Sequence, residues 1–390
     1  MKAIELFAGI GGFRVAVDSQ KINTVWANDL CPKACAVYRS NFGKTELHEG
    51  DINQLKEGIP AHDLLTGGFP CQPFSSAGKK KGIHDPRGTL FEVIVDVLRS
   101  HQPKYFIIEN VKRLLTMERG LHFATILASL AELNYRIEWR LLNAMHFGLP
   151  QNRQRVFLLG IQNAVEFNAG PGSVKSRMAS PADLSGLNEN ELEKFDDMGY
   201  WTPIERHGVR FPSWGLAAEG KFFGADLEEF SQQSASVAIH QVLQESVSEE
   251  FDFTESTLQW LSKNTPVNRF VQGVEILSNQ AGGARMGYTI FGINGVAPTL
   301  TSTTSRHYER YKIGERFRRL TNIEYARIQG FPDDHCDVVS VYDQYSLFGN
   351  AAPPPMARWV MDKINTVGIS VDSLPHKTKY RTLFDYANER

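Results

Sequence analysis

The chain has 390 residues, of which 42% are hydrophobic, 22% charged and 11% aromatic, a composition typical of a soluble globular protein. This length is sufficient for a full α/β core and a second, smaller domain. The sequence opens directly into a strand-like run with no signal peptide, and no stretch approaches 18 uninterrupted apolar residues. We therefore expect a cytoplasmic protein without a membrane segment.

The formal net charge of −2 conceals an uneven distribution. Residues 163–262 hold 17 acidic and 6 basic side chains, whereas the rest of the chain holds 36 basic and 27 acidic ones. A basic body with an acidic insert can bind a polyanion locally, although most such asymmetries are solvated surface.

The 4 cysteines are sparse, which fits a reducing compartment and argues against a disulfide framework. Cys31 and Cys35 lie one helical turn apart, with no second Cys or His pair nearby. We interpret them as packing residues rather than zinc ligands, and we expect no metal.

The first 160 residues alternate short apolar runs with amphipathic stretches, which is the strand–helix–strand pattern of a parallel sheet. The predicted elements are strands over 2–7, 24–29, 62–68, 104–110, 135–142 and 155–161, and a helix over 31–41.

Asp85-Pro86 predicts the start of a further helix, whose apolar residues repeat at helical spacing from Leu90 to Leu98. The pattern changes near residue 163, and compact patterned segments return at 319–332 and 344–360. The outline is one α/β domain whose last elements come from the C-terminus, with a variable domain inserted before them.

A glycine-rich turn, Phe7-Ala8-Gly9-Ile10-Gly11-Gly12, follows the first strand. Glycines let the backbone approach a ligand closely, and a helix N-terminus offers free N–H groups. Alone, the segment also fits a tight turn, and a nicotinamide cofactor is a rival ligand. The spaced G-x-G-x-x-G fingerprint is incomplete, because Val15 lies three residues after Gly12.

Acidic residues end the next two candidate strands. Asp29 can accept both hydroxyls of a ribose, and Asp51, in Glu49-Gly50-Asp51-Ile52, can accept from an adenine amino group. Each alone also fits a helix cap or a turn. Together with the glycine turn they mark the carboxyl edge of the sheet, where open α/β sheets bind their ligands.

The strongest local signal is Gly67-Gly68-Phe69-Pro70-Cys71-Gln72-Pro73-Phe74-Ser75. A lone cysteine between prolines, after an apolar strand, is held rigid and presented at the sheet edge. Its thiolate is a soft nucleophile suited to adding across an activated double bond. The alternative is a buried small hydrophobe, for which flanking Gly and Pro are poor surroundings.

Glu109 comes directly after the apolar Phe106-Ile107-Ile108. A carboxyl at the mouth of an apolar pocket has a raised pKa and can hold or donate a proton near neutrality, although a helix-capping Glu-Asn pair is the alternative. In Gln151-Asn152-Arg153-Gln154-Arg155, alternate residues share one face of an extended segment. Both guanidiniums can then converge on one site, with a solvated charge run as the alternative.

The segments FPCQPFS, ENV and QxRxR, in this order, closely resemble those of the DNA methyltransferases that form 5-methylcytosine, of the bacterial restriction–modification type. The resemblance covers about residues 3–160 and 318–360. It implies an α/β fold, with a Rossmann-like S-adenosylmethionine-dependent methyltransferase sheet and an inserted, smaller target-recognition domain. We place the catalytic domain at 1–164 plus 335–390, and the DNA-reading domain at 165–334, including a hinge segment at 318–334.

The resemblance implies a role for each catalytic residue. Cys71 would attack carbon 6 of cytosine, so that carbon 5 accepts the methyl group. Glu109 would contact ring nitrogen 3 and the exocyclic amine, Arg155 would hold the base oxygen, and Arg153 would help position the catalytic loop. Because the target carbon is inaccessible inside a duplex, the base must be flipped out into this pocket.

The implied cofactor is S-adenosyl-L-methionine, with its methionine part at the glycine turn, its ribose at Asp29 and its adenine beside Leu30 and Asp51. The expected cofactor-binding residues are Phe7, Ala8, Gly9, Gly11, Gly12, Asp29, Leu30, Asp51, Ile52, Pro70, Asn350 and Ala351. After Asn350 and Ala351 the sequence departs from the family, because Ala352-Pro353-Pro354-Pro355 replaces the usual aliphatic run. We expect the prolines to delay the start of the next helix.

The implied substrate partner is double-stranded DNA. Residues 76–82 resemble the family's mobile loop, with glycine hinges and three lysines suited to phosphate contact; a solvated basic turn is the alternative. Pro298-Thr299-Leu300 resembles the Thr-Leu element of the target-recognition domain, and basic and aromatic residues surround it. The expected DNA-contacting residues are Ser75, Lys79, Lys80, Lys81, Arg87, Thr299, Leu300, Arg306 and Arg310.

Two alternatives remain beside the DNA methyltransferase. An RNA methyltransferase of the tRNA-modifying branch shares the catalytic motifs, but the insert of about 150 residues favours DNA. A non-catalytic binding module, or a nicotinamide-dependent oxidoreductase, is opposed by the complete set of catalytic positions and by the missing third glycine. The family's commonest setting suggests a companion restriction endonuclease acting on the same site, and a monomer is the default.

Overall fold

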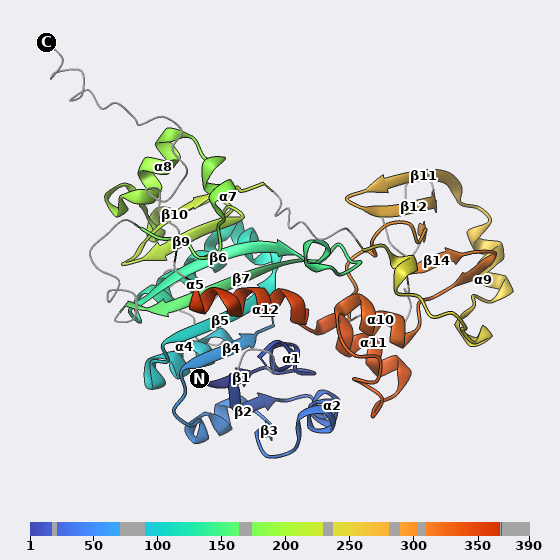
Figure 1. Cartoon of the computed structure of the whole chain (residues 1–390), viewed down its shortest axis with the longest axis horizontal. Helices are drawn as coiled ribbons and strands as arrows, with labels where there is room; N and C mark the ends of the chain where they lie inside the picture. Colours follow the sequence, from blue (N-terminus) through green and yellow to red (C-terminus); the bar gives the residue numbers. More distant parts are fainter. Residues whose placement is uncertain are drawn as a thin grey trace, which may run out of the picture.

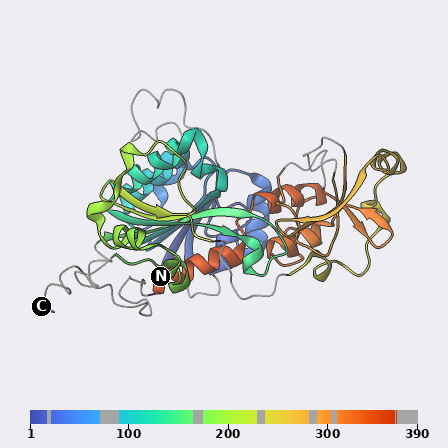
Figure 2. The same cartoon turned by 90° about the horizontal axis from the view of Figure 1, so that it is seen from above.

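The computed structural model describes residues 1–17, 22–70, 90–163, 174–228, 237–280, 289–302, 309–366 and 368. Figures 1 and 2 show an elongated molecule, with a large sheet-based body at one end and a smaller sheet-based lobe at the other. Over the described residues, the body is built on a ten-stranded sheet and the lobe on a five-stranded sheet.

The body's sheet has the strand order β3-β2-β1-β4-β5-β7-β6-β9-β10-β8. Its first five strands are parallel and leave their carboxyl ends at one edge. They are β1 (Lys2–Leu6), β2 (Asn23–Asp29), β3 (Leu47–Glu49), β4 (Leu64–Gly68) and β5 (Tyr105–Val111). The strands predicted in this part of the sequence are confirmed to within two residues.

The strands β6 (Tyr135–Asn143) and β7 (Gln154–Gln162) also form where the sequence predicted them. However, β7 runs antiparallel to both β5 and β6, so the prediction of a wholly parallel sheet is wrong here. The connection between β6 and β7 contains only a short 3₁₀ turn, Ala144–Phe147. Parallel neighbours need a longer crossover, usually a helix, so this connection permits only an antiparallel pair.

Helices cover both faces of the sheet (Figure 1). On one face, α4 (Leu90–His101) and α5 (Leu121–Ala131) pack in one apolar cluster with residues of β1, β4 and β5. On the other, α1 (Gly12–Val17) and α12 (Pro354–Asp362) pack on β5 and β7. The helices α2 (Pro32–Phe42) and α3 (Ile52–Leu55) follow β2 and β3.

The helix predicted from the Leu90–Leu98 spacing is confirmed as α4, and Asp85-Pro86 lies outside the described residues. The described helices include none long and apolar enough to cross a membrane.

Residues 174–228 extend the body's sheet instead of forming a separate domain. The strand β9 (Trp214–Ala218) pairs with β6, and β10 (Lys221–Ala225) and β8 (Thr202–Pro203) follow it. Short helices α7 (Pro181–Ser185) and α8 (Glu189–Asp196) lie beside them. The boundary expected at residue 164 therefore does not coincide with an edge of the sheet. The acidic residues of 163–262 are spread over the whole stretch, whereas β9 within it is entirely buried and apolar.

The smaller lobe follows residue 237. Its strands are β11 (Thr265–Val271), β12 (Val274–Asn279), β13 (Thr289–Phe291), β14 (Arg310–Ile313) and β15 (Arg316–Arg318), and its helix is α9 (Glu255–Leu261). The helices α10 (Asn322–Gln329) and α11 (Val341–Asn350) join the lobe to the body (Figure 1). One apolar cluster runs through this junction, from Tyr311 of the lobe through Phe348 of α11 to Ile10 of the body.

Candidate active site and the adjoining cleft

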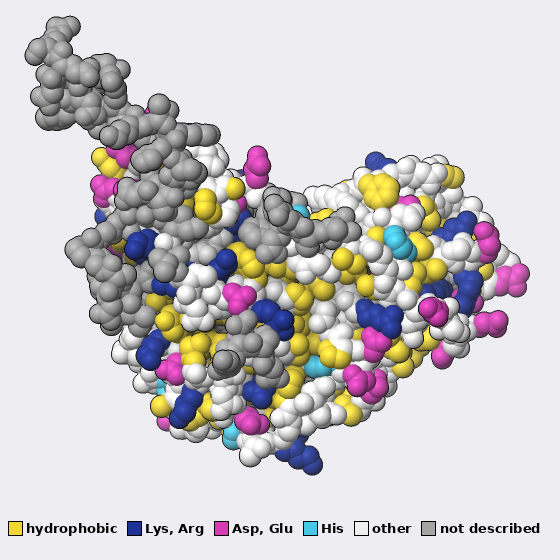
Figure 3. Space-filling view, in the orientation of Figure 1, with side chains coloured by type: hydrophobic (Ala, Val, Ile, Leu, Met, Phe, Trp, Pro, Cys, Tyr) yellow, Lys and Arg dark blue, Asp and Glu magenta, His cyan; other side chains and the backbone are white. Residues whose placement is uncertain are grey.

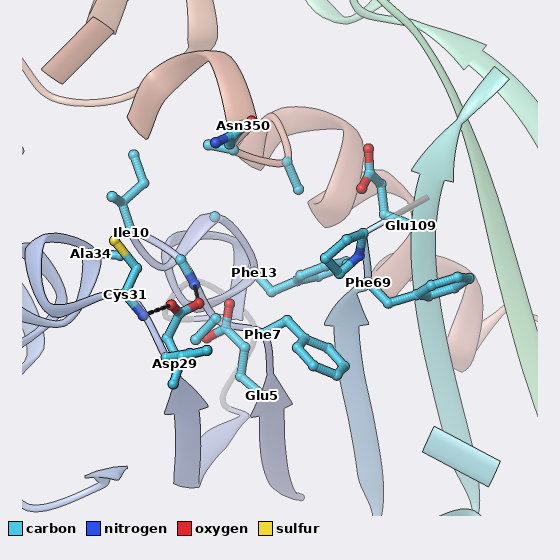
Figure 4. A pocket seen from close by; sticks show the side chains of 18 of the residues that line it. Glu5, Phe7, Ile10, Phe13, Asp29, Cys31, Ala34, Phe69, Glu109 and Asn350 are labelled. Atoms are coloured by element: carbon cyan, nitrogen blue, oxygen red, sulfur yellow. Dashed lines mark hydrogen bonds between the residues drawn. The ribbon is translucent and has the colours of Figure 1, made fainter. Parts of the chain in front are cut away.

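A cavity of about 730 Å³ opens at the carboxyl edge of the parallel strands, and its size is typical of a ligand or cofactor site. We call it the edge cavity. Figure 4 shows Asp29 and Asn350 on opposite sides of it, with Glu109 on β5, two strands beyond β1 in the sheet. The lining residues include these sequence-predicted ones: Phe7, Ala8, Gly9, Gly12, Asp29, Leu30, Asp51, Ile52, Pro70, Glu109, Arg155, Asn350 and Ala351.

The glycine turn owes its shape to residues with positive φ. Gly9 and Gly11 have φ of 56° and 84°. Gly11 is not among the described lining residues, and a Cβ at this position would lie 2.4 Å from the ring of Phe42. The structure therefore packs Gly11 against α2, and its contact with the cofactor stays a prediction. Gly12 lines the cavity and also lets α1 approach the start of α12, because its Cβ would lie 2.3 Å from the Ala352 carbonyl oxygen.

Asp29 lies at the end of β2 with its carboxylate turned toward the glycine turn (Figure 4). The Gly9 amide donates to Oδ2 at 2.7 Å, and the Cys31 amide donates to Oδ1 at 2.8 Å. Burial raises the pKa of Asp29, and these amide hydrogen bonds oppose the rise. A carboxylate has about four acceptor positions, so Asp29 can still accept from a ligand hydroxyl.

The two neighbouring cysteines differ in environment. Cys35 is buried as expected, but Cys31 is exposed and lines the edge cavity. The interpretation of Cys31 as a packing residue is wrong because it precedes α2, where the chain is still at the rim of the cavity.

Asp51 both caps a helix and lines the cavity. Its Oδ1 accepts from the Asn53 amide at 2.9 Å at the start of α3. Asn28 also lines the cavity, and it is not among the site residues predicted from the sequence. The Asn28 side chain donates through Nδ2 to the carbonyls of His48 and Gly50 at 2.8 and 3.0 Å, which fixes the turn that carries Asp51.

Glu5 is the second lining residue that sequence reasoning missed. It lies within β1, is 2% exposed, and accepts from the Tyr38 hydroxyl at 3.2 Å. Its Oε1 has no hydrogen-bond partner among the described residues. Burial raises the pKa of Glu5 to about 8, while Tyr38 and Arg14 oppose the rise. A single acidic residue inside the apolar run Ala3-Ile4-Glu5-Leu6 was the available signal.

Glu109 and Arg155 form an ion pair on the cavity wall. The Arg155 Nε donates to Glu109 Oε1 at 2.9 Å, and both side chains are largely buried. Burial raises the pKa of the Glu109 carboxyl, and the neighbouring guanidiniums of Arg155 and Arg153 oppose the rise. Gly68 permits this arrangement, since a Cβ there would lie 3.1 Å from Glu109 Oε2. The wall therefore presents a carboxyl and a guanidinium side by side.

Arg153 does not join this pair. It is fully buried, and its guanidinium donates to the carbonyl oxygens of Leu300, Gly349 and Ala351. The expectation that both guanidiniums converge on one site is wrong, because β7 begins only at Gln154 and the preceding residues are not a regular strand. The role of Arg153 in positioning the catalytic loop stays a prediction, because that loop lies outside the described residues.

The proline run begins α12 instead of delaying it. Pro353 is the N-cap of α12 and Pro354 its first residue. The first amides of a helix have no partner within the helix, so proline costs nothing there. Asn350 is the last residue of α11, and with Ala351 it reaches the cavity despite the unusual sequence that follows.

A second cavity, of about 570 Å³, lies between the body and the lobe, and we call it the interlobe cleft. Four of its lining residues are basic, and none of the described ones is acidic. The basic residues are Lys112, Arg113, Arg155 and Arg269. Figure 3 shows hydrophobic side chains gathered between body and lobe on the displayed face, with Lys and Arg side chains on either side of them.

The expected DNA-contacting residues divide into four groups. Thr299 lines the interlobe cleft, and its hydroxyl donates to the Asn152 carbonyl at 2.6 Å. Leu300 is fully buried, so its side chain is unavailable to DNA. The Arg310 guanidinium lies over the rings of Phe253 and Trp260 and is not among the described cleft residues. The remaining expected residues, with the proposed nucleophile, lie outside the described residues: Cys71, Ser75, Lys79, Lys80, Lys81, Arg87 and Arg306.

Three cleft residues were missed in the sequence. Lys112 and Arg113 directly follow β5, so a basic pair next to the ENV segment was a usable signal. Arg269 lies on β11, and only the fold brings it opposite them.

The fold is that of solved methyltransferase structures. The crystal structure of S. pombe Dnmt2 methyltransferase superimposes with a TM-score of 0.60 at 19% sequence identity, covering 94% of this chain and all of that one. The structure of a putative DNA modification methyltransferase encoded in an E. coli prophage gives a TM-score of 0.52 at 18% identity, covering 93% and 98%.

The model of the C-5 cytosine-specific DNA methylase family matches residues 1–366, and the chain belongs to this family. Type II methyltransferase M1.ScrFI of Lactococcus lactis subsp. cremoris is 30% identical, over 93% of this chain and 77% of that protein. Type II methyltransferase M.HgiCI of Herpetosiphon aurantiacus is 31% identical, over 93% and 97%. The expected family, fold class and enzyme class, a DNA cytosine-5 methyltransferase, are confirmed.

Proposed function

We propose that the chain methylates carbon 5 of one specific cytosine in duplex DNA, with the duplex in the interlobe cleft and the target base flipped into the edge cavity. One observation carries this proposal: Val111 and Arg155 line both cavities. A base extruded from a duplex in the cleft therefore meets the Glu109–Arg155 pair as soon as it enters the edge cavity.

The edge cavity suits the cofactor that the family implies. Its wall combines apolar surface at Phe7 and Ile52 with the carboxyls of Asp29 and Glu5, and the Oε1 of Glu5 lacks a partner among the described residues. We propose that Asp29 holds the ribose hydroxyls, Asp51 and Ile52 the adenine, and Phe7 and Gly9 the methionine part. S-adenosylmethionine, when bound, supplies an electrophilic methyl group.

We propose that the protein's own residues activate the base. The thiolate of Cys71 forms a bond to carbon 6, and this raises the electron density at carbon 5. Protonated Glu109 donates to ring nitrogen 3 and accepts from the exocyclic amine, which stabilises the negative charge as the thiolate adds. Arg155 donates to the base oxygen. After methyl transfer a base removes the proton from carbon 5, and elimination of the Cys71 thiolate restores the double bond.

The cleft is proposed to hold the DNA backbone. Lys112, Arg113 and Arg269 lie on two opposed walls and suit phosphate contact, whereas Thr299 lies near the flipped nucleotide. We place the DNA-reading unit in the lobe after residue 237, because residues 174–228 continue the body's sheet. The relatives are named Type II methyltransferases. We therefore propose a companion endonuclease acting on the same site. We also propose that the enzyme acts as a monomer.

The test is covalent trapping with duplexes that carry 5-fluorocytosine in all short sequence contexts. Fluorine blocks the loss of a proton from carbon 5, so a turning-over enzyme stays bonded to the DNA. We expect a denaturation-stable adduct with the wild type and S-adenosylmethionine, and none with Cys71→Ser or without the cofactor. No adduct on any duplex, with labelled methyl groups entering tRNA instead, would replace DNA by RNA as the substrate.

A further inference from the structure

Three buried polar side chains connect the wall of the interlobe cleft to the wall of the edge cavity. They are Gln151 and Arg153, which precede β7, and Gln329 at the end of α10, and each is 0% exposed. None of them is among the described residues that line either cavity. We call these three residues the buried relay.

Arg153 touches both walls through their backbones. Its Nη1 donates to the Leu300 carbonyl at 2.8 Å, and Leu300 directly follows Thr299 of the cleft wall. Its Nη2 donates to the carbonyls of Gly349 and Ala351 at 2.9 and 3.0 Å, and both residues line the edge cavity. One planar guanidinium therefore fixes the distance between the two walls.

The two glutamines connect the same walls by a second route. The Leu300 amide donates to Gln151 Oε1 at 2.9 Å, and Gln151 Nε2 donates to Gln329 Oε1 at 2.8 Å. Gln329 Nε2 in turn donates to the Phe348 carbonyl, one residue before Gly349. Both backbone groups of Leu300 are thus tied, through side chains, to the last turn of α11.

The two walls are also in close backbone contact. A Cβ at Gly349 would lie 2.3 Å from the Thr301 carbonyl oxygen, so α11 and the 299–301 segment cannot approach further. The buried charge of Arg153 has no carboxylate within ion-pair distance among the described residues, and burial lowers its pKa. Such a charge stabilises the fold less than apolar packing of the same volume would. The arrangement therefore calls for a role besides stability.

We infer that the buried relay couples DNA binding to cofactor binding, with Arg153 as a positioning residue and not a catalytic one. The inference rests on the proposed function, with DNA in the cleft and the cofactor in the edge cavity. DNA seated against Thr299 fixes the Leu300 peptide, and the relay transmits that position to Gly349–Ala351. The wall is then already ordered when the cofactor binds, so each ligand raises the affinity for the other by the same factor.

The test measures this factor directly. The dissociation constant of S-adenosylhomocysteine is determined by calorimetry, with and without a duplex that the wild type methylates. We expect the duplex to tighten wild-type binding at least tenfold, which is about 1.4 kcal/mol of coupling. In Arg153→Lys, which keeps the charge but loses the planar fork, we expect a ratio below threefold.

A second variant separates coupling from loss of a wall contact. Gln329→Met keeps the side-chain volume and removes the hydrogen bonds to Gln151 and Phe348, at a residue that is not among the described lining residues of either cavity. We expect it to lower the coupling ratio as well. The matched control is Arg140→Lys. Arg140 is a buried arginine of β6 that holds Asp183 through a bidentate pair and lines neither the edge cavity nor the interlobe cleft. Its loss should lower stability and leave the ratio unchanged.

The outcomes distinguish this inference from the proposed function. If the wild type methylates no DNA, the proposed function fails first. If it methylates DNA but both relay variants keep the wild-type ratio, the relay is structural only and the inference is wrong. A wild-type ratio near one would mean that the two ligands bind independently, and the inference would again be wrong. If Arg153→Lys does not fold, Gln329→Met alone decides between the two results.

Discussion

Glu5 is an acidic residue in the middle of an apolar strand, and its ionisation is linked to folding. Its pKa is raised from 4.5 to about 8 in the folded protein, mainly by burial. Between these values the folded chain holds a proton that the unfolded chain has released. The contribution of Glu5 to the free energy of unfolding therefore falls as the pH rises through this window, by up to about 5 kcal/mol, and is constant above it.

Glu5→Gln removes this pH dependence. Glutamine stays neutral in both states and can still accept from the Tyr38 hydroxyl. We expect the variant to match the wild type near pH 5 and to be more stable by several kcal/mol near pH 8, as measured by urea unfolding without cofactor. The control is Glu49→Gln, which removes a more exposed carboxylate paired with Arg39 and should leave the slope in place. Parallel profiles of unfolding free energy against pH for the wild type and Glu5→Gln would show that Glu5 is ionised in the folded protein.

Glu109 provides a test of proton supply in the proposed reaction. Burial raises its pKa, and Arg155 opposes this rise, so the protonated carboxyl is lost only as the pH climbs past the ordinary range of a glutamate. Glu109→Gln keeps the shape but has no proton to transfer. We expect kcat to fall by about 10²-fold or more, and the alkaline decline of kcat to disappear.

The readouts are single-turnover methyl transfer between pH 6 and 9 and cofactor affinity in the same buffers. Cofactor affinity should change by less than threefold, because Glu109 faces the base and not the proposed ribose site. Wild-type rates in Glu109→Gln at every pH would assign the proton to another donor.

At the scale of elements, the position of the glycine turn depends on how closely α1 approaches α12. Ala at Gly12 would place its methyl carbon 2.3 Å from the Ala352 carbonyl oxygen, and α1 would have to move. We expect Gly12→Ala to lower the free energy of unfolding by roughly 1–3 kcal/mol, as overpacking does. Because the glycine turn moves with α1, cofactor binding should weaken roughly tenfold, a loss of about 1.4 kcal/mol. Calorimetry and thermal unfolding measure both.

Gly58→Ala is the matched control, because a Cβ there meets nothing within 4 Å. It should change stability by less than about 0.5 kcal/mol and leave cofactor binding unaltered. Equal effects of the two substitutions would rule out the contact with Ala352 as the cause.

The elements were predictable where one local signal determined them. Apolar runs that end in glycine or an acidic residue predicted β1, β2, β4 and β5, and the apolar residues from Leu90 to Leu98 predicted α4. The direction of β7 was not predictable from periodicity, because strand direction depends on the length of the connection. Likewise, β9 and β10 were missed because each has only five residues and contains a glycine, which weakens a strand pattern.

The residues of the site were also predictable only where a local signal determined their position. Residues at the carboxyl ends of predicted strands, such as Asp29, Asp51 and Glu109, line one cavity because parallel strands share one carboxyl edge. Arg153 and Leu300 were misplaced, since their surroundings come from contacts between residues more than 140 positions apart. Arg269 was missed for the same reason: only the folded lobe places it opposite Lys112 and Arg113.

At the scale of the whole molecule, the two lobes place positive charge on both sides of one cleft. Lys112 and Arg113 belong to the body and Arg269 to the lobe, while the acidic residues of α8 lie on the extension of the sheet. The net charge of −2 therefore does not describe the surface that DNA would meet. Local charge governs this electrostatic attraction, because exposed charges are screened over about 10 Å at 0.1 M salt.

This arrangement predicts a measurable change in salt dependence. Each arginine that contacts a phosphate releases counterions, and its loss makes the slope of log Kobs against log salt less negative by about 0.9. We expect this change from Arg113→Gln and from Arg269→Gln, and about twice the change from the double variant, since they lie on different walls. Fluorescence anisotropy of a labelled, non-specific duplex from 50 to 200 mM salt measures the slopes. Arg206→Gln, at an exposed position of the body outside the cleft, is the control and should leave the slope unchanged. If the double variant keeps the wild-type slope, DNA binds on another surface.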